Sequence, residues 1–143
     1  MKIKICGITN YEDAKLACDL GAEAIGFIFY NKSKRFVNAE IVKNIIEKLP
    51  PFTIKVGVFV NEETNVVNQI MQNCKLNFTQ LHGDENIEYI QKIHYPIIKA
   101  FRVSQNIDFS YLNIFSKHNI LLDTFNEKEF GGTGTKFNWE IIS

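Results

Sequence analysis

The chain has 143 residues, of which 45% are hydrophobic and 22% charged, and its formal net charge is zero. This balance is typical of a soluble globular protein, and we expect one domain over residues 1–143. The neutral charge gives no basic excess to attract nucleic acid. No apolar run approaches the roughly 20 residues of a membrane-spanning helix, and Lys2 and Lys4 interrupt the start where a signal peptide would be apolar. We therefore expect a cytoplasmic protein that binds neither nucleic acid nor membranes.

The three cysteines, Cys6, Cys18 and Cys74, are odd in number and far apart in the sequence. This spacing argues against a disulfide framework, and no Cys/His pairing has the spacing of a zinc site. Free thiols fit a reducing compartment. The sequence therefore predicts no metal site.

The first element predicted is a short strand that ends at a thiol. Lysine and isoleucine alternate over residues 2–5, and Cys6 and Gly7 follow directly. Asn10 is suited to cap a helix that Gly21 ends. Reactive side chains are often found at the end of a strand, beside a glycine that permits a sharp turn, and Cys6 has this position.

The same alternation of strand and helix continues along the chain. Further strands are expected over residues 22–30, 54–60, 77–81, 97–103 and 120–122, and helices over residues 38–49, 64–71, 87–93 and 108–115, with the start of another at 138–142. Six strands alternating with helices predict a parallel sheet. Both a partial (β/α)8 barrel and a doubly wound open sheet satisfy this pattern, and the length alone favours the open sheet.

Polar and reactive residues follow the strands, at their carboxyl ends, where the active face of either architecture lies. Cys6 is either a small packing residue or a thiolate that acts as base or nucleophile. Asp123 either caps the following loop or donates a proton as general acid. Arg35 either lies on a solvated surface or holds a carboxylate, and His82 either polarises a substrate or fixes a loop.

Gly131 and Gly132 begin a glycine-rich loop, GGTG. The loop matches neither the P-loop pattern nor GxGxxG, so a phosphate site and a mobile lid both remain open from the residues alone.

With these residues in view, the sequence closely resembles the phosphoribosylanthranilate isomerase family of tryptophan biosynthesis. The resemblance runs in the family's order along the whole chain. It rests on the stretches KICGIT at 4–9, EDA at 12–14, GAEAIGFIFY at 21–30, SKRFV at 33–37, VGVFVNE at 56–62, QLHGDE at 80–85, LLDT at 121–124 and GGTGTKFNW at 131–139.

The resemblance implies an α/β fold, a (β/α)8 TIM barrel of which this chain holds about the first six units. It implies an Amadori rearrangement without metal or redox cofactor, on a small phosphoribosyl substrate, by a monomer or homodimer. Cys6 matches the family's base and Asp123 its acid. Arg35 matches the residue that binds the anthranilate carboxylate. His82, Gly131 and Gly132 are expected to bind substrate.

The family continues into a seventh and an eighth unit, whose glycine-rich loops bind the substrate phosphate. Three interpretations are therefore considered at this point. The chain is either an isomerase or a non-catalytic fragment of that barrel without the phosphate-binding loops. The third, another sugar-phosphate barrel enzyme such as an epimerase, is weakened because the sequence lacks paired metal-ligand histidines.

Overall fold

Strands and helices alternate along the chain, as the sequence predicts. The structure is a computed structural model, and it describes residues 1–103 and 109–124. The elements are β1 (Lys4–Cys6), α1 (Tyr11–Asp19), β2 (Ala24–Ile28), α2 (Ala39–Ile46), β3 (Ile54–Phe59), α3 (Thr64–Asn73), β4 (Phe78–Leu81), α4 (Ile87–Ile90), β5 (Ile97–Val103), α5 (Phe109–Asn113) and β6 (Asn119–Thr124). The expected helix at 138–142 lies outside the described residues.

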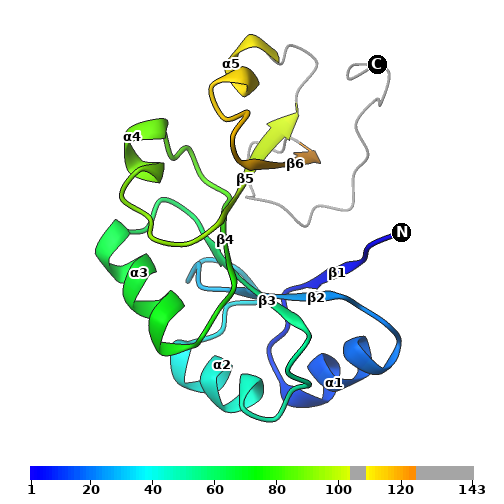
Figure 1. Cartoon of the computed structure of the whole chain (residues 1–143). Helices are drawn as coiled ribbons and strands as arrows, with labels where there is room; N and C mark the ends of the chain where they lie inside the picture. Colours follow the sequence, from blue (N-terminus) through cyan, green and yellow to red (C-terminus); the bar gives the residue numbers. More distant parts are fainter. Residues whose placement is uncertain (104–108, 125–143) are drawn as a thin grey trace.

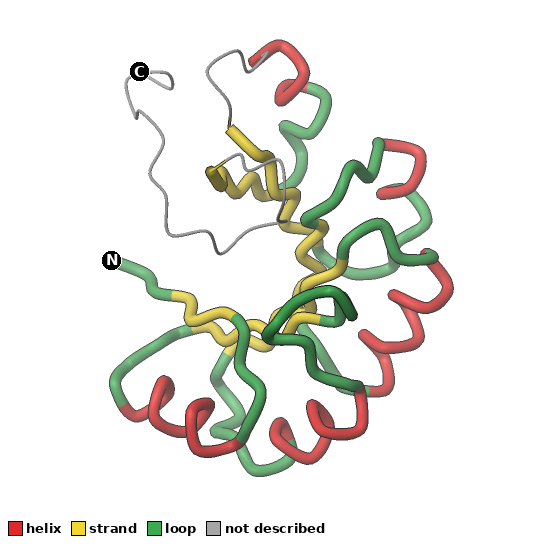
Figure 2. The backbone as a smooth tube through the Cα atoms, turned by 180° about the vertical axis from the view of Figure 1, so that it is seen from behind, coloured by secondary structure: helices red, strands yellow, loops and turns green. Residues whose placement is uncertain are grey.

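The six strands form one parallel sheet in the order β1-β2-β3-β4-β5-β6. The sheet curves into an arc, and α1 to α4 lie along its outer side (Figure 1). Seen from behind, the strands again form the inner line of the arc and the helices the outer line (Figure 2). A doubly wound sheet would reverse its strand order and carry helices on both faces. The expected partial barrel is therefore confirmed, and the open doubly wound alternative is wrong.

Asparagine side chains fix where three of the helices begin. Asn10, Asn38 and Asn86 each accept a hydrogen bond from the backbone N–H three residues further on, which satisfies a donor that the first turn leaves free. The helix α4 ends at Ile90, earlier than the expected 93. Pro96 directly precedes β5, which begins at Ile97, and the residue before a proline is disfavoured in helical conformation, so little length remains for a helix there.

The hydrophobic core lies between the sheet and the helices. Ile25 and Phe27 of β2 are fully buried in it, together with Val42 of α2 and Val67 of α3. Side chains alternate across a strand, so Gly26 faces the inner side of the arc. None of the helices in the described part of the chain has the length and apolar character needed to cross a membrane.

Candidate active site

A cavity of about 350 Å³ opens on the inner side of the arc, near the carboxyl ends of the strands. Its lining includes Cys6 at the end of β1, Arg35 from the loop after β2, His82 directly after β4 and Asp123 in β6. The structure thus brings four of the predicted site residues together. The other two, Gly131 and Gly132, lie outside the described residues.

Cys6 is half-buried, and its position depends on the neighbouring strand. It pairs with Gly26 of β2, and a Cβ added to that glycine would lie 2.8 Å from the Cys6 Sγ. The absence of a side chain at Gly26 therefore leaves room for the thiol. The other cysteines have packing roles, as the sequence predicts: Cys18 Sγ lies 3.4 Å from Thr53 Oγ1, and burial raises the pKa of the Cys74 thiol.

The Arg35 side chain reaches back to β1. Its Nη1 donates a hydrogen bond of 2.8 Å to the carbonyl oxygen of Cys6. The guanidinium lies against Gly7, whose φ of +87° favours glycine, and a Cβ there would come within 2.6 Å of Nη1. Since a guanidinium has five N–H donors, this one bond leaves donors for a ligand.

His82 joins Asp123 to Gln80. The Gln80 Nε2 lies 2.9 Å from His82 Nδ1, and His82 Nε2 lies 3.0 Å from Asp123 Oδ2. Because an amide nitrogen only donates, Nδ1 accepts and Nε2–H donates to the carboxylate. The other oxygen of Asp123 accepts from the Thr124 N–H at 2.8 Å. The carboxylate is therefore held in place from two sides.

Burial lowers the pKa of His82, although the hydrogen bond and the negative charge of Asp123 act in the opposite direction. The charges of Lys99 and Lys4 add to the lowering. His82 is therefore neutral at neutral pH, which agrees with its role as acceptor from Gln80 and donor to Asp123.

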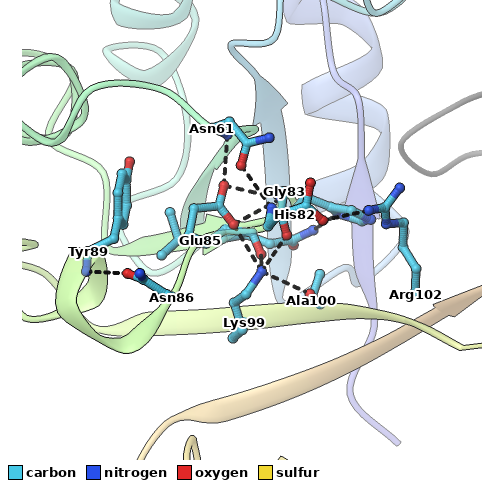
Figure 3. Close-up of polar contacts among 12 residues, drawn as sticks. Asn61, His82, Gly83, Glu85, Asn86, Tyr89, Lys99, Ala100 and Arg102 are labelled. Carbon is cyan, nitrogen blue, oxygen red and sulfur yellow. Dashed lines mark hydrogen bonds and ion pairs between the residues drawn. The ribbon is translucent and has the colours of Figure 1, made fainter. Parts of the chain in front are cut away.

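A buried polar network holds the loop that carries His82 (Figure 3). Lys99 Nζ of β5 lies 2.9 Å from Glu85 Oε2 and donates to the Gly83 carbonyl at 2.7 Å. Glu85 Oε1 accepts from the backbone N–H groups of Asn61 and Gly83. The network thus links the carboxyl ends of β3 and β4 to β5, and it fixes the backbone directly after His82.

Several residues of the cavity were absent from the sequence predictions, among them two polar residues on strands. Lys4 and Gln80 both line the cavity. Each lies two positions before a predicted site residue, Cys6 at the end of β1 and His82 directly after β4, so the period of two that governs strands would have found them. In the described part of the chain, no group of three or more His, Cys, Asp or Glu side chains is arranged to hold a metal ion.

Comparison with known proteins identifies the family. Residues 3–143 match the family model of N-(5'-phosphoribosyl)anthranilate (PRA) isomerase. The chain is 45% identical over 143 residues to the N-(5'-phosphoribosyl)anthranilate isomerase of Bacillus cereus strain AH187, covering 100% of this chain and 70% of that protein. The chain belongs to the phosphoribosylanthranilate isomerase family.

Other members of the phosphoribosylanthranilate isomerase family agree in sequence and in structure. The Trichlorobacter lovleyi protein is 46% identical over 141 residues, which are 99% of this chain and 69% of the relative. The crystal structure from Thermotoga maritima superposes with a TM-score of 0.92 at 44% identity, covering 99% of this chain and 70% of that one. The chain thus spans about 70% of the length of these family members.

One solved member of the family carries a bound ligand. It is a phosphoribosyl anthranilate isomerase in complex with reduced 1-(o-carboxyphenylamino)-1-deoxyribulose 5-phosphate. It superposes with a TM-score of 0.83 at 45% identity, over 88% of this chain and 66% of that one.

Proposed function

We propose that this chain carries out the isomerisation of N-(5-phosphoribosyl)anthranilate, an aminoaldose, to the aminoketose 1-(2-carboxyphenylamino)-1-deoxyribulose 5-phosphate. The observation that carries the proposal is the meeting of Cys6 and Asp123 in one cavity, although they come from the first and the last strand of the sheet. An isomerisation of this type needs an acid and a base that act on different atoms of one sugar. Membership of the family supports the same reaction.

The proposed first step opens the ribose ring. In the protonated form that this step requires, the Asp123 carboxyl gives its proton to the ring oxygen and becomes the carboxylate that His82 stabilises. The bond between the ring oxygen and C1 breaks, and the nitrogen lone pair forms a C1=N double bond. The product is a protonated Schiff base. His82 holds the carboxyl through its Nε2 and so orients the acid.

The proposed second step moves the double bond. Cys6 removes the proton from C2, and the C–H electron pair forms a C1=C2 bond while the C=N pair returns to nitrogen. The enolamine then takes a proton at C1 and loses the O2 proton, which gives the ketone. No electrons enter or leave the substrate overall, so the step needs no redox partner.

The remaining proposed contacts bind the two ends of the substrate. Arg35 lines the cavity, and its side-chain bond to the Cys6 carbonyl uses one of five N–H donors. We propose that the guanidinium binds the anthranilate carboxylate. Gly131 and Gly132 are proposed to contact the substrate, although they lie outside the described residues.

We propose that residues 1–143 belong to one domain, and that the protein acts as a monomer or a homodimer.

An assay with two variants tests this function. Purified chain is mixed with phosphoribosylanthranilate, and the loss of anthranilate-type fluorescence is followed. Cys6→Ser and Asp123→Asn are each expected to slow the reaction by about 10²–10⁴-fold, since each removes a group that transfers a proton. Cys18→Ser is the matched control, because Cys18 does not line the cavity. Activity that persists in both site variants would refute the assignment. No activity in the unaltered chain would favour a non-catalytic fragment.

A further inference from the structure

Lys4 places a positive charge beside the thiol of Cys6. The two residues share one face of β1, and both line the cavity. The neighbouring side chains, Ile3 and Ile5, line a second groove with α1, which Cys6 also borders, whereas Lys4 lines the cavity and not this groove. A lysine head group that points into the cavity is unexpected, because a strand end offers it easy access to solvent.

Gly26 of β2 shows how closely the two groups are packed. A Cβ added at Gly26 would lie 2.8 Å from the Cys6 Sγ, 3.1 Å from the Lys4 Nζ and 3.2 Å from the Lys4 Cε. The thiol and the ammonium therefore both lie directly over Gly26, on the side of the sheet that faces the cavity. Any larger residue at this position would displace both of them.

The positive charges near the cavity differ in what they already bind. Arg35 donates to the Cys6 carbonyl, and Lys99 is paired with Glu85. For Lys4 the structure gives no ion pair or hydrogen bond within residues 1–103 and 109–124. The charge of Lys4 nevertheless acts within the cavity, because it makes a small contribution to the lowered pKa of His82.

We propose that the Lys4 ammonium is the counter-ion of the Cys6 thiolate and thereby makes Cys6 the base of the reaction. A thiol removes a proton only in its thiolate form, and a neighbouring cation favours that form. The catalytic consequence rests on the proposed function, whereas the pairing of the two side chains does not. The other titratable or charged groups that line the cavity are Tyr30, Arg35, His82 and Asp123. The positive charge of Lys4 offsets the negative charge that Asp123 brings to the cavity.

Alkylation of the cysteines by iodoacetamide, resolved by peptide mass spectrometry over a pH series, tests the pairing without any substrate. Lys4→Met keeps most of the length of the side chain and removes the charge, so Cys6 is expected to react about tenfold more slowly near neutral pH. Lys4→Arg is expected to restore the rate. Lys2→Met is the matched control, because Lys2 is exposed, lies outside the cavity lining and carries the same charge. Cys18 and Cys74 serve as internal controls in every sample.

An unchanged Cys6 rate in folded Lys4→Met, verified by circular dichroism, would overturn the proposal. If Lys4→Met does not fold, Lys4→Gln is judged by the same criterion. Isomerase activity is measured in parallel, and Lys4→Met is expected to lower kcat with little change in KM. If the unaltered chain has no isomerase activity but Lys4→Met still slows the alkylation of Cys6, the proposed function is refuted and the pairing of Lys4 with Cys6 stands. If the unaltered chain is an active isomerase and Cys6 in Lys4→Met is alkylated at the normal rate, the role of Lys4 is refuted and the proposed function stands.

Discussion

His82 is a buried imidazole between an amide donor and a carboxylate, and this environment makes it sensitive to pH. Burial lowers its pKa below the usual 6.5 in the folded protein. As the pH falls through about 6.5, the unfolded chain therefore takes up a proton before the folded chain does. The free energy of unfolding is thus expected to fall as the pH falls from about 6.5 to the lower pKa that His82 has in the folded protein. Below that pKa, His82 is expected to cause no further change.

Urea unfolding at a series of pH values measures this effect. His82→Gln is expected to show a flatter pH dependence over the same window, because the titrating group is absent. His94→Gln is the matched control, since it removes an exposed imidazole and leaves the His82–Asp123 pair in place. Equal pH slopes in unaltered protein and His82→Gln would contradict the expected contribution.

Gly7 permits the Arg35 side chain to lie across the end of β1. In Gly7→Ala a methyl group would meet the Arg35 Nη1 at 2.6 Å and would also strain a positive φ, at a cost of about 1–2 kcal/mol. Gly21→Ala strains a φ of +90° with no atom within 4 Å, so it carries the strain without the contact. Both variants are expected to lose similar stability in urea unfolding, whereas a raised KM is expected only in Gly7→Ala. A raised KM in both variants would show that strain, and not Arg35, is responsible.

At the scale of the elements, the turn between β4 and α4 is held by a buried ion pair. The side chains of Lys99 and Glu85 are 3% and 1% exposed. Glu85→Gln would leave the Lys99 ammonium buried without its counter-charge, so a loss of about 3–5 kcal/mol in the free energy of unfolding is expected. The double variant Glu85→Gln/Lys99→Met should recover part of this loss, because neither charge then remains buried.

Urea unfolding of the single and double variants checks this prediction. Lys15→Met provides the control, because it breaks an ion pair with Asp19 in which both side chains are about half exposed, and its effect should be much smaller. A Glu85→Gln variant as stable as Lys15→Met would show that the buried pair contributes little.

Much of this element arrangement was predictable from the sequence, for physical reasons. The alternation of strand and helix and the Asn10 cap are local, so they could be predicted from neighbouring residues. The choice between an arc and a doubly wound sheet depends on which strands pair, which composition and length do not decide. It was the family resemblance that favoured the barrel.

The candidate site was predictable where a reactive side chain ends a strand, as with Cys6 and Asp123. Its contacts were not, because they join residues that are far apart in the chain. His82 bonds to a carboxylate 41 positions away, and Arg35 to a carbonyl 29 positions away. Lys4 was visible in the alternation of its strand, but its approach to Cys6 depends on Gly26 of the next strand.

At the scale of the whole molecule, the sheet is an arc with two edges. Within the described residues, β1 and β6 each pair with a neighbour on one side only. Ile5 of β1 and Ile120 of β6 are exposed, at 42% and 41%. Water therefore has access to the strands that carry the two proposed proton-transfer groups, and exclusion of water strengthens electrostatic interactions in an active site.

This openness leads to a prediction about the rate. A polypeptide of residues 1–143 is expected to turn over phosphoribosylanthranilate at least about tenfold more slowly than the Bacillus cereus relative, because the open edges of the described sheet admit water to the proposed site. Steady-state kcat/KM values of the two proteins, measured side by side, check it. Values within tenfold of one another would contradict the expectation.

The sequential strand order also has a consequence for how the protein folds. Each strand pairs with the strand before it in the chain, so the sheet can grow one unit at a time, with short loops to close at each step. During synthesis, the earlier units can begin to assemble before the later ones have been made. Cys6 is among the first residues to be made and Asp123 among the last of those described. The site draws on both ends of the described sheet, so we expect it to be complete only when β6 has joined the sheet.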